Sequence, residues 1–287
     1  MTRTLVLSAV VAAATASAAS AAPVSYTGGA YLQDFNGLPT TPTASSVSAV
    51  IPGKGPHDFP TTGVMASAGM EGWTMSNYDG SSVDTEYRAQ NGSQAGSAGR
   101  GVVSFGTINS AERALGVLAT SNQISRFGLA LINDSSTTYD QFTLDFVGEQ
   151  WRRGNVAAPG NAISYDWAVT GNYGSGVGQD NINTDAAFAN IGSIASPNNQ
   201  PAPTEVALDG NLPANQVAVS KTVTGLNWTP GSVLLLRFSG QDISGQDDGL
   251  AIDDLRFSAS AVPEPGSIAL AGLALGALTI VGRRRRS

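Results

Sequence analysis

The apolar residues of this chain occur in short runs in which every second residue is apolar, and turn-forming residues separate the runs. Residues 138–147 are the clearest example, because Phe142, Leu144 and Phe146 fall on alternate positions. A period of two places such side chains on one face of a β-strand, whereas a helix requires a period near 3.6. Between the two ends of the chain, no long stretch has the helical period. The pattern therefore predicts an all-β fold.

The alternating runs amount to about ten to twelve short strands, which is typical of a sandwich or a barrel. Residues 124–132 and 138–147 are separated by a short polar turn, so we expect them to form an antiparallel hairpin. Residues 38–60 are rich in proline, threonine and serine and are expected to form a long loop. No internal repeat or break in composition divides the chain between its ends. We predict one antiparallel two-sheet sandwich of the jelly-roll type.

Residues 1–22 have the composition of a secretory signal peptide. Arg3 precedes the apolar residues 5–14, and small residues follow as far as Ala22. Segments of this kind are removed during export, so we expect cleavage after Ala22. Residues 23–261 then form the body of the protein, which is long enough to bury one sizeable core.

The C-terminal residues 262–287 combine a proline-containing entry, an uncharged run and a cluster of arginines. At 1.5 Å per residue, residues 266–282 would form a helix of about 25 Å, against a hydrocarbon core of about 30 Å. Arginines that follow an apolar helix favour the cytoplasmic side of a membrane. We therefore predict a single transmembrane helix rather than the alternative, a buried C-terminal core helix. The motif consists of Val262, Pro263, Glu264, Pro265, Arg283, Arg284, Arg285 and Arg286.

This tail resembles the PEP-CTERM sorting signal of Gram-negative exosortase systems, through Pro263-Glu264-Pro265, the apolar run and the terminal arginines. The resemblance implies that exosortase recognises the tail at the inner membrane and cleaves it near the prolines. The protein would be anchored in the inner membrane before processing. Afterwards it would reach the cell surface or the extracellular space, in association with exopolysaccharide.

Several blocks of the body resemble an exported β-sandwich domain of bacterial surface proteins that carry sorting tails. The blocks begin at Gln33, Arg113, Gly148, Leu208 and Asp247 and read QDFNGL, RALG, GEQWR, LDGN and DDGLAIDD. The DFNGL and AIDDL segments also resemble the first and last strands of lectin-like jelly rolls. This second resemblance would place the two ends of the body side by side.

The composition of the body excludes several classes of function. It keeps 10 of the 15 basic residues and 21 of the 22 acidic residues, a net charge of about −11, which argues against nucleic acid as a partner. The chain has no cysteine and one histidine, His57 in a Pro/Gly segment, so thiolate and multi-histidine metal sites are excluded. No nucleophile elbow accompanies His57. We predict that the protein is not an enzyme.

Aspartates near the two ends of the body are candidates for a structural calcium site. Calcium prefers carboxylate, carbonyl and amide oxygens. If the first and last strands are neighbours, Asp34 or Asn36 could join Asp253 and Asp248. Because successive strand residues face opposite sides, only one of Asp253 and Asp254 is expected to point inward. The alternative is a set of solvated turn aspartates with no ion.

Glu149, Trp151 and Arg152 follow a predicted core strand and are the candidates for a carbohydrate site. Trp151 could stack on a sugar ring while Glu149 and Arg152 bind its hydroxyl groups. The alternative is structural, with Trp151 filling the sandwich and Glu149 paired with Arg152 or Arg153.

Three functions follow from these observations. The first is a non-catalytic protein of the cell surface or exopolysaccharide, and the second is a lectin-like carbohydrate-binding module. The third is a glycoside hydrolase that uses two carboxylates, although no pair of acidic residues is singled out by the sequence.

Overall fold

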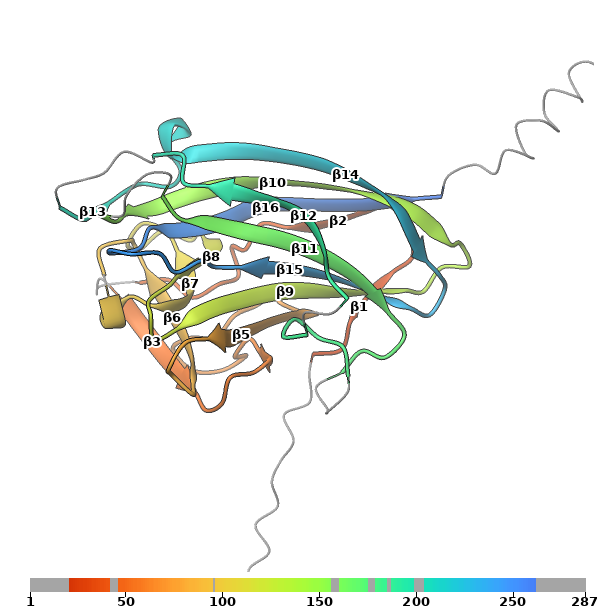
Figure 1. The fold of residues 1–287 in the computed structure, drawn as a ribbon, viewed down its shortest axis with the longest axis horizontal. Coiled ribbons are helices and arrows are strands. Elements are labelled where there is room, and N and C mark those ends of the chain that lie inside the picture. The colour runs from red at the N-terminus through yellow and green to blue at the C-terminus, as the bar shows by residue number, and fades with distance from the viewer. Residues whose placement is uncertain are drawn as a thin grey trace, which may run out of the picture.

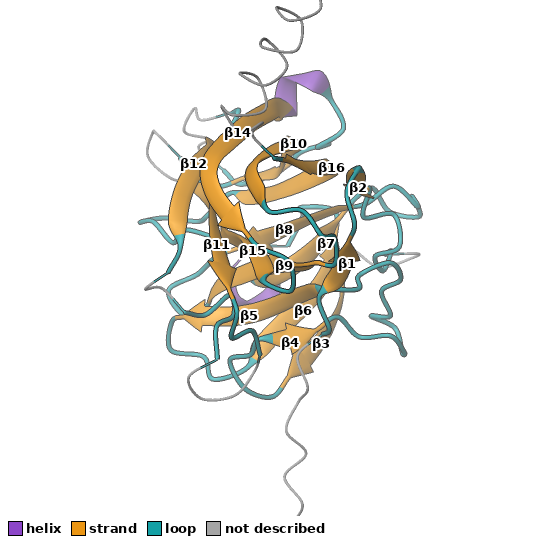
Figure 2. Cartoon of the chain, turned by 90° about the vertical axis from the view of Figure 1, so that its right-hand side faces the viewer, coloured by secondary structure: helices purple, strands orange, loops and turns teal. Residues whose placement is uncertain are grey.

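The computed structural model describes residues 21–41, 46–94, 96–155, 160–174, 179–184, 187–198 and 204–261. Two β-sheets lie face to face and form a sandwich (Figure 1). Figure 2 shows that strands and loops make up almost all of this region, together with two short helical turns, η1 (Gly96–Ala98) and η2 (Pro213–Asn215). The prediction of an all-β two-sheet sandwich is confirmed.

The first sheet has seven strands, in the order β12-β11-β15-β9-β5-β4, with β1 paired to β9. Its strands are β1 (Val24–Tyr26), β4 (His57–Asp58), β5 (Trp73–Asp79), β9 (Ile124–Asn133), β11 (Ala162–Thr170), β12 (Ala189–Ala195) and β15 (Val233–Ser239).

The second sheet has nine strands, in the order β13-β10-β16-β8-β7-β6-β3, while β14 pairs with β10 and β2 pairs with β16. Its strands are β2 (Ala30–Gln33), β3 (Ser46–Ile51), β6 (Thr85–Gln90), β7 (Gly101–Phe105), β8 (Ala114–Leu118), β10 (Tyr139–Arg153), β13 (Val206–Ala207), β14 (Gln216–Trp228) and β16 (Gly249–Ser260). The pairs β1–β9 and β6–β7 are parallel, so the sheets are not wholly antiparallel as predicted.

The main core lies between the sheets and is rich in aromatic side chains. Phe238 on β15 stacks on Phe127 of β9, with ring centroids 5.1 Å apart. It also meets the edge of Phe146, which comes from β10 in the other sheet, at 5.8 Å. Contacts of this kind bury large apolar areas and hold the two sheets together. A second, smaller cluster includes Phe105 and Trp151.

The predicted hairpin of residues 124–132 and 138–147 is wrong, because β9 and β10 belong to different sheets. The connection between them crosses the sandwich, and the Asn133 side chain donates to the carbonyls of Thr137 (2.8 Å) and Trp228 (2.9 Å) to hold it. Both strands do turn apolar residues inward, but these residues face one another across the core. Alternation reports which face is buried and does not reveal whether two strands lie side by side or face to face.

Two other expectations need revision. The segment 38–60 contains β3 and β4, so it is not a continuous loop. In the part of the chain that the structure describes, no helix is long and apolar enough to span a bilayer. The predicted transmembrane helix and the sorting residues from Val262 onward lie outside the described residues, as does nearly all of the predicted signal peptide.

Candidate metal centre and surface groove

Strand β16 contains one more residue than its partner β10 over the same length. Asp145 pairs with Arg256 and Val147 pairs with Asp253, so two steps along β10 match three along β16. Asp254 adopts the left-handed conformation, with φ of 50°, as expected at a β-bulge. Ile252 and Leu255 both belong to the main core, so the two aspartates between them face away from it. The expectation that one aspartate points inward is therefore wrong, because the bulge interrupts the alternation.

Three carboxylates come together beside this bulge. The nearest oxygens of Glu112, Glu149 and Asp253 all lie within 4.8 Å of one another. Glu149 is on β10, Asp253 is on β16 and Glu112 precedes β8, and these three strands are neighbours in the nine-stranded sheet. The sheet order, rather than the sequence, brings them to one place.

The segment around Gly210 closes this carboxylate cluster. Glu149 is 2 % exposed and accepts hydrogen bonds from Trp151 Nε1 (2.8 Å) and Gln216 Nε2 (2.9 Å). A Cβ atom at Gly210 would come 2.3 Å from Trp151 Nε1, so the backbone can approach the indole only because this residue is glycine. Asn211 donates to one oxygen of Glu112 at 2.5 Å, while the other oxygen is buried without a hydrogen-bond partner.

The electrostatics of the cluster disfavour three negative charges. Burial raises the pKa of Glu149 to about 7, despite the donors Trp151 and Gln216, and Glu112 and Asp254 raise it further. Burial also raises the pKa of Asp253, with Glu149 as an additional cause. Among the described residues, no lysine or arginine forms an ion pair with any of the three. A divalent cation would allow all three to ionise, and carboxylate oxygens are the ligands that calcium prefers.

The predicted calcium ligands are placed differently from what the sequence suggested. Strands β2 and β16 do pair, as the hypothesis required, and Asp253 is part of the cluster. Asp34, however, accepts from the Asn36 backbone N–H (3.1 Å), and the Asn36 side chain accepts from the backbone N–H of Arg113 (3.1 Å). Glu112 and Glu149 are the carboxylates that meet Asp253, and no sequence pattern marks Glu112 as a ligand.

Asp248 has a different function from the one predicted for it. It is 3 % exposed, and its carboxylate accepts from the Gly154 N–H (2.6 Å), the Ser196 hydroxyl (2.5 Å) and the Asn161 N–H (3.4 Å). These bonds tie the acidic loop before β16 to two other segments. Asp248 is not one of the three carboxylates that come together beside the bulge, so it is removed from the set of metal ligands.

The predicted carbohydrate residues are buried. Trp151 is 1 % exposed and its ring stacks on Phe105, with centroids 6.3 Å apart and an interplanar angle of 8°. Arg152 is 2 % exposed, donates to the Gly92 carbonyl (3.0 Å) and forms an ion pair with Glu205. No ring face of Trp151 is available to a sugar, so the stacking hypothesis is wrong and the structural alternative holds for this residue.

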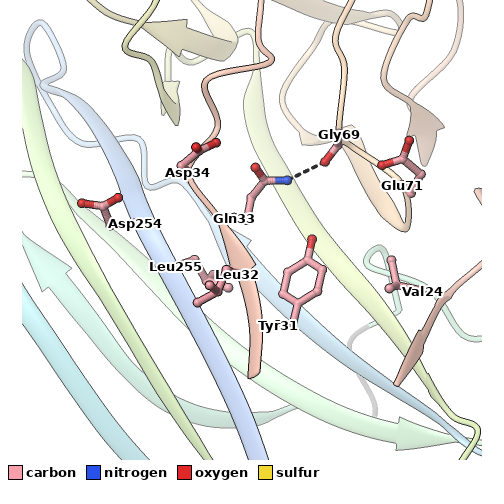
Figure 3. Close-up of a pocket in the computed structure, with 9 residues that line it drawn as sticks. All are labelled: Val24, Tyr31, Leu32, Gln33, Asp34, Gly69, Glu71, Asp254 and Leu255. Atoms are coloured by element: carbon pink, nitrogen blue, oxygen red, sulfur yellow. Dashed lines mark hydrogen bonds between the residues drawn. The ribbon is translucent and has the colours of Figure 1, made fainter. Parts of the chain in front are cut away.

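An open groove of about 540 Å³ lies on the other side of the bulge (Figure 3). Its lining combines Tyr31 and Leu32 of β2 with the carboxylates of Asp34, Glu71 and Asp254. Figure 3 shows Asp254 and Glu71 on opposite sides of β2, with Asp34 between them. Leu32 is 65 % exposed. The volume is within the range of about 300–1,000 Å³ found for small-molecule sites.

Hydrogen bonds fix the walls of the groove. The hydroxyl of Tyr31 accepts from Trp73 Nε1 at 2.8 Å. The side chain of Gln33 donates to the Gly69 carbonyl (2.6 Å, dashed in Figure 3) and accepts from the Phe35 N–H (2.9 Å). These bonds fix the distance between strand β2 and the loop before β5, so a ligand would meet a preformed surface.

Comparison with known proteins identifies the C-terminal segment. Residues 261–286 match the PEP-CTERM protein-sorting motif, which implies processing by exosortase and an exported, cell-surface protein. The predicted sorting tail is therefore confirmed. No curated protein sequence matches the chain.

Solved structures similar to the sandwich include carbohydrate-binding modules. One is a CBM61 module in complex with β-1,4-galactotriose, at 10% identity over 58% of this chain and 86% of that one, with a TM-score of 0.28. Another is the N-terminal cellulose-binding domain of Cellulomonas fimi β-1,4-glucanase C, at 12% identity over 68% and 93%, with a TM-score of 0.29. A third is a CBM28 module specific for non-crystalline cellulose, at 13% identity over 57% and 84%, with a TM-score of 0.27. The likeness concerns the β-sandwich architecture alone.

Proposed function

We propose that this chain is a non-catalytic protein of the cell surface or its exopolysaccharide, delivered there by exosortase. The observation that carries the proposal is the sorting motif at residues 261–286. The acidic cluster argues against a hydrolase, because Glu149 and Asp253 are 2 % and 7 % exposed and a polysaccharide cannot reach them. Hydrolysis would require two carboxylates on either side of an accessible glycosidic bond.

The delivery step is tested in the native host. Cell fractions and the mass of the mature C-terminus should show a surface form that ends near Pro263–Pro265. Replacement of Arg283–Arg286 by alanine should leave the uncleaved protein in the membrane fraction. Normal cleavage and surface delivery of this variant would contradict the proposal.

We also propose that the cluster of Glu112, Glu149 and Asp253 holds a structural calcium ion. The residues fit because they supply six carboxylate oxygens, one of which is buried without a partner, and contain no nitrogen or sulfur donor. The ion would join three neighbouring strands and neutralise their buried charge. Equilibrium dialysis of the processed protein should retain about one calcium per chain after washing, and none in an Asp253→Asn variant; retention by that variant would exclude the site.

A second candidate function is carbohydrate binding in the open groove. The observation that favours it is the combination of Tyr31 and an exposed Leu32 with several hydrogen-bonding carboxylates in one preformed hollow. Apolar side chains can cover the C–H face of a sugar while the carboxylates accept from its hydroxyl groups. A glycan array should show ligands that Tyr31→Ala and Leu32→Ala weaken, whereas Leu212→Ala, at a site that is 53 % exposed elsewhere, should not. An unchanged pattern in both groove variants would contradict this function.

A further inference from the structure

The groove at β2 differs from a neutral sugar site in its charge. Three carboxylates line it, those of Asp34, Glu71 and Asp254, and no lysine, arginine or histidine is among the lining residues. Asp34 uses one oxygen to accept from the Asn36 N–H. Within the described residues, the carboxylates of Glu71 and Asp254 accept no hydrogen bond and form no ion pair. The groove therefore presents negative charge that the protein itself does not neutralise.

The nearest basic residue along the strands is Arg256. It is exposed on β16, pairs in register with Leu32 and lies outside the groove lining. One guanidinium at the margin offsets part of the charge of three carboxylates, and the body as a whole carries about −11. The field in the groove consequently favours a cation over an anion.

Asp254 also belongs to a neighbouring hollow. That residue lines a second, shallower hollow of about 350 Å³ that crosses β10 and β14 next to Asp145. Asp145 accepts from the Ser220 hydroxyl there at 2.5 Å. A ligand that fills the groove and extends over this hollow would be a chain of several sugar units rather than a single ring.

We infer that the groove binds an oligosaccharide with protonated amino groups, such as a β-1,4-linked glucosamine polymer, and rejects polymers of uronic acids. The inference rests on the proposal that this groove binds saccharides. Leu32, which is exposed on β2, would contact the C–H face of one ring, while Glu71 and Asp254, on opposite sides of β2, would pair with the amino groups of different units. A uronate would place carboxylate against carboxylate in the same hollow.

Calorimetric titration of the processed protein from its host provides the test. The probes are short oligomers of glucosamine, of N-acetylglucosamine and of galacturonate, at a pH where the amines are protonated. We expect the glucosamine oligomer to bind about tenfold more tightly than the acetylated one, which a few partly screened ion pairs can supply. The galacturonate oligomer should not bind, and the preference for the amine should shrink at high salt.

Matched variants separate the preference from binding itself. The double variant Glu71→Gln/Asp254→Asn should lose most of the preference for the glucosamine oligomer and still bind the acetylated one. Asp134→Asn, which changes an exposed acidic residue in the β9–β10 connection, should alter neither affinity. Equal affinity for both oligomers, with no effect of the double variant, would overturn the amino-sugar preference and leave carbohydrate binding intact. Absence of binding to every oligomer would overturn both. If the unmodified protein binds no sugar but binds calcium, and the Glu71→Gln variant loses that calcium, the groove would be a metal site instead.

Discussion

Asp253 and Asp254 are neighbours in the sequence, but they belong to two acidic sites with opposite properties. Asp253 is 7 % exposed and meets Glu112 and Glu149 beneath the segment around Gly210, whereas Asp254 is exposed and lines the open groove. In the closed site Glu149 and Asp253 are buried, so their carboxylates are disfavoured as anions unless a cation joins them. In the open site, water screens the charges and leaves them available to a ligand. One bulge residue separates the two sites.

Asp248 provides the reference for this comparison. It is buried like Asp253, but the protein supplies three donors to its carboxylate. Protein donors satisfy the single carboxylate of Asp248, whereas in the cluster three carboxylates meet, and one oxygen of Glu112 has no protein partner although Glu149 accepts from Trp151 and Gln216. The comparison teaches that burial alone does not mark a metal ligand, since what distinguishes the cluster is the meeting of three carboxylates and an oxygen without a partner.

The largest expected effect is at the reference residue. Asp248→Ala removes the acceptor of the Gly154 N–H, the Asn161 N–H and the Ser196 hydroxyl. It should therefore lower the free energy of unfolding by about 3 kcal/mol, since it leaves buried donors without partners. Urea denaturation measures the change. Asp134→Ala, at an exposed position, should stay within about 0.5 kcal/mol, and a similar result for both variants would show that the donors at Asp248 do not stabilise the fold.

The next effect concerns calcium and separates the two acidic sites directly. At calcium about a hundredfold above Kd, binding adds about 2.7 kcal/mol, which raises Tm by roughly 5–10 °C for a body of this size. Glu149→Gln with Asp253→Asn should abolish this rise, while Asp254→Asn should keep it. Scanning calorimetry with calcium or with a chelator measures both. A full rise in the cluster variant would show that the ion binds elsewhere.

A smaller effect tests the bulge that divides the sites. Asp254 has φ of 50°, a conformation that asparagine and glycine tolerate and that β-branched residues avoid. Asp254→Val should therefore lower the free energy of unfolding by about 1–2 kcal/mol, whereas Asp254→Asn should be nearly neutral. Thermal unfolding in the presence of a chelator isolates this change from metal binding. Equal stability of the two variants would mean that the bulge relaxes at no cost.

The remaining prediction concerns the pH dependence of the metal-free protein. Burial raises the pKa of Glu149 to about 7 and that of Asp247, which also faces Asp242, to about 7. The folded state then retains protons that the unfolded chain loses above about pH 4, so the free energy of unfolding falls as the pH rises from about 5 to about 8, and each unit of pKa shift contributes about 1.4 kcal/mol.

Denaturation of the chelated protein across this pH range checks the sign. Asp247→Asn should reduce the slope, because asparagine keeps an acceptor for Asn161 and Ile243 and cannot ionise. The calcium-induced rise in Tm should be larger at pH 8 than at pH 5, since the ion competes with protons for the cluster. A stability that increases with pH in the absence of metal would contradict the closed nature of the site.

Much of the architecture could be predicted from local patterns. The alternation in residues 138–147 correctly identifies Phe142, Leu144 and Phe146 as core residues. The same reasoning failed at the predicted hairpin, because sequence proximity does not show which sheet a strand joins. It failed at Asp253 and Asp254 because a bulge adds a residue without any signal beyond an aspartate, which tolerates the left-handed conformation.

The candidate site was predictable in part. Asp253 was singled out by the AIDD segment, and the pairing of the first and last strands was anticipated, as the pairing of β2 with β16 shows. Glu112 could not be found, because it lies in an unremarkable polar turn before β8. Trp151 carried a choice between a sugar platform and a core residue, and its stacking on Phe105 decides for the core.

By itself, the sequence determined the class of fold and the route of delivery. Both are recorded in local order: a period of two in the strands, and prolines, an apolar run and arginines in the tail. Only the tertiary structure decided which acidic groups meet, since Glu112, Glu149 and Asp253 are brought together by the order of strands β8, β16 and β10. Strand order depends on contacts between segments that are distant in the sequence, and the burial of a carboxylate depends on which segments cover it. Neither can be deduced from the residues next to that carboxylate in the sequence.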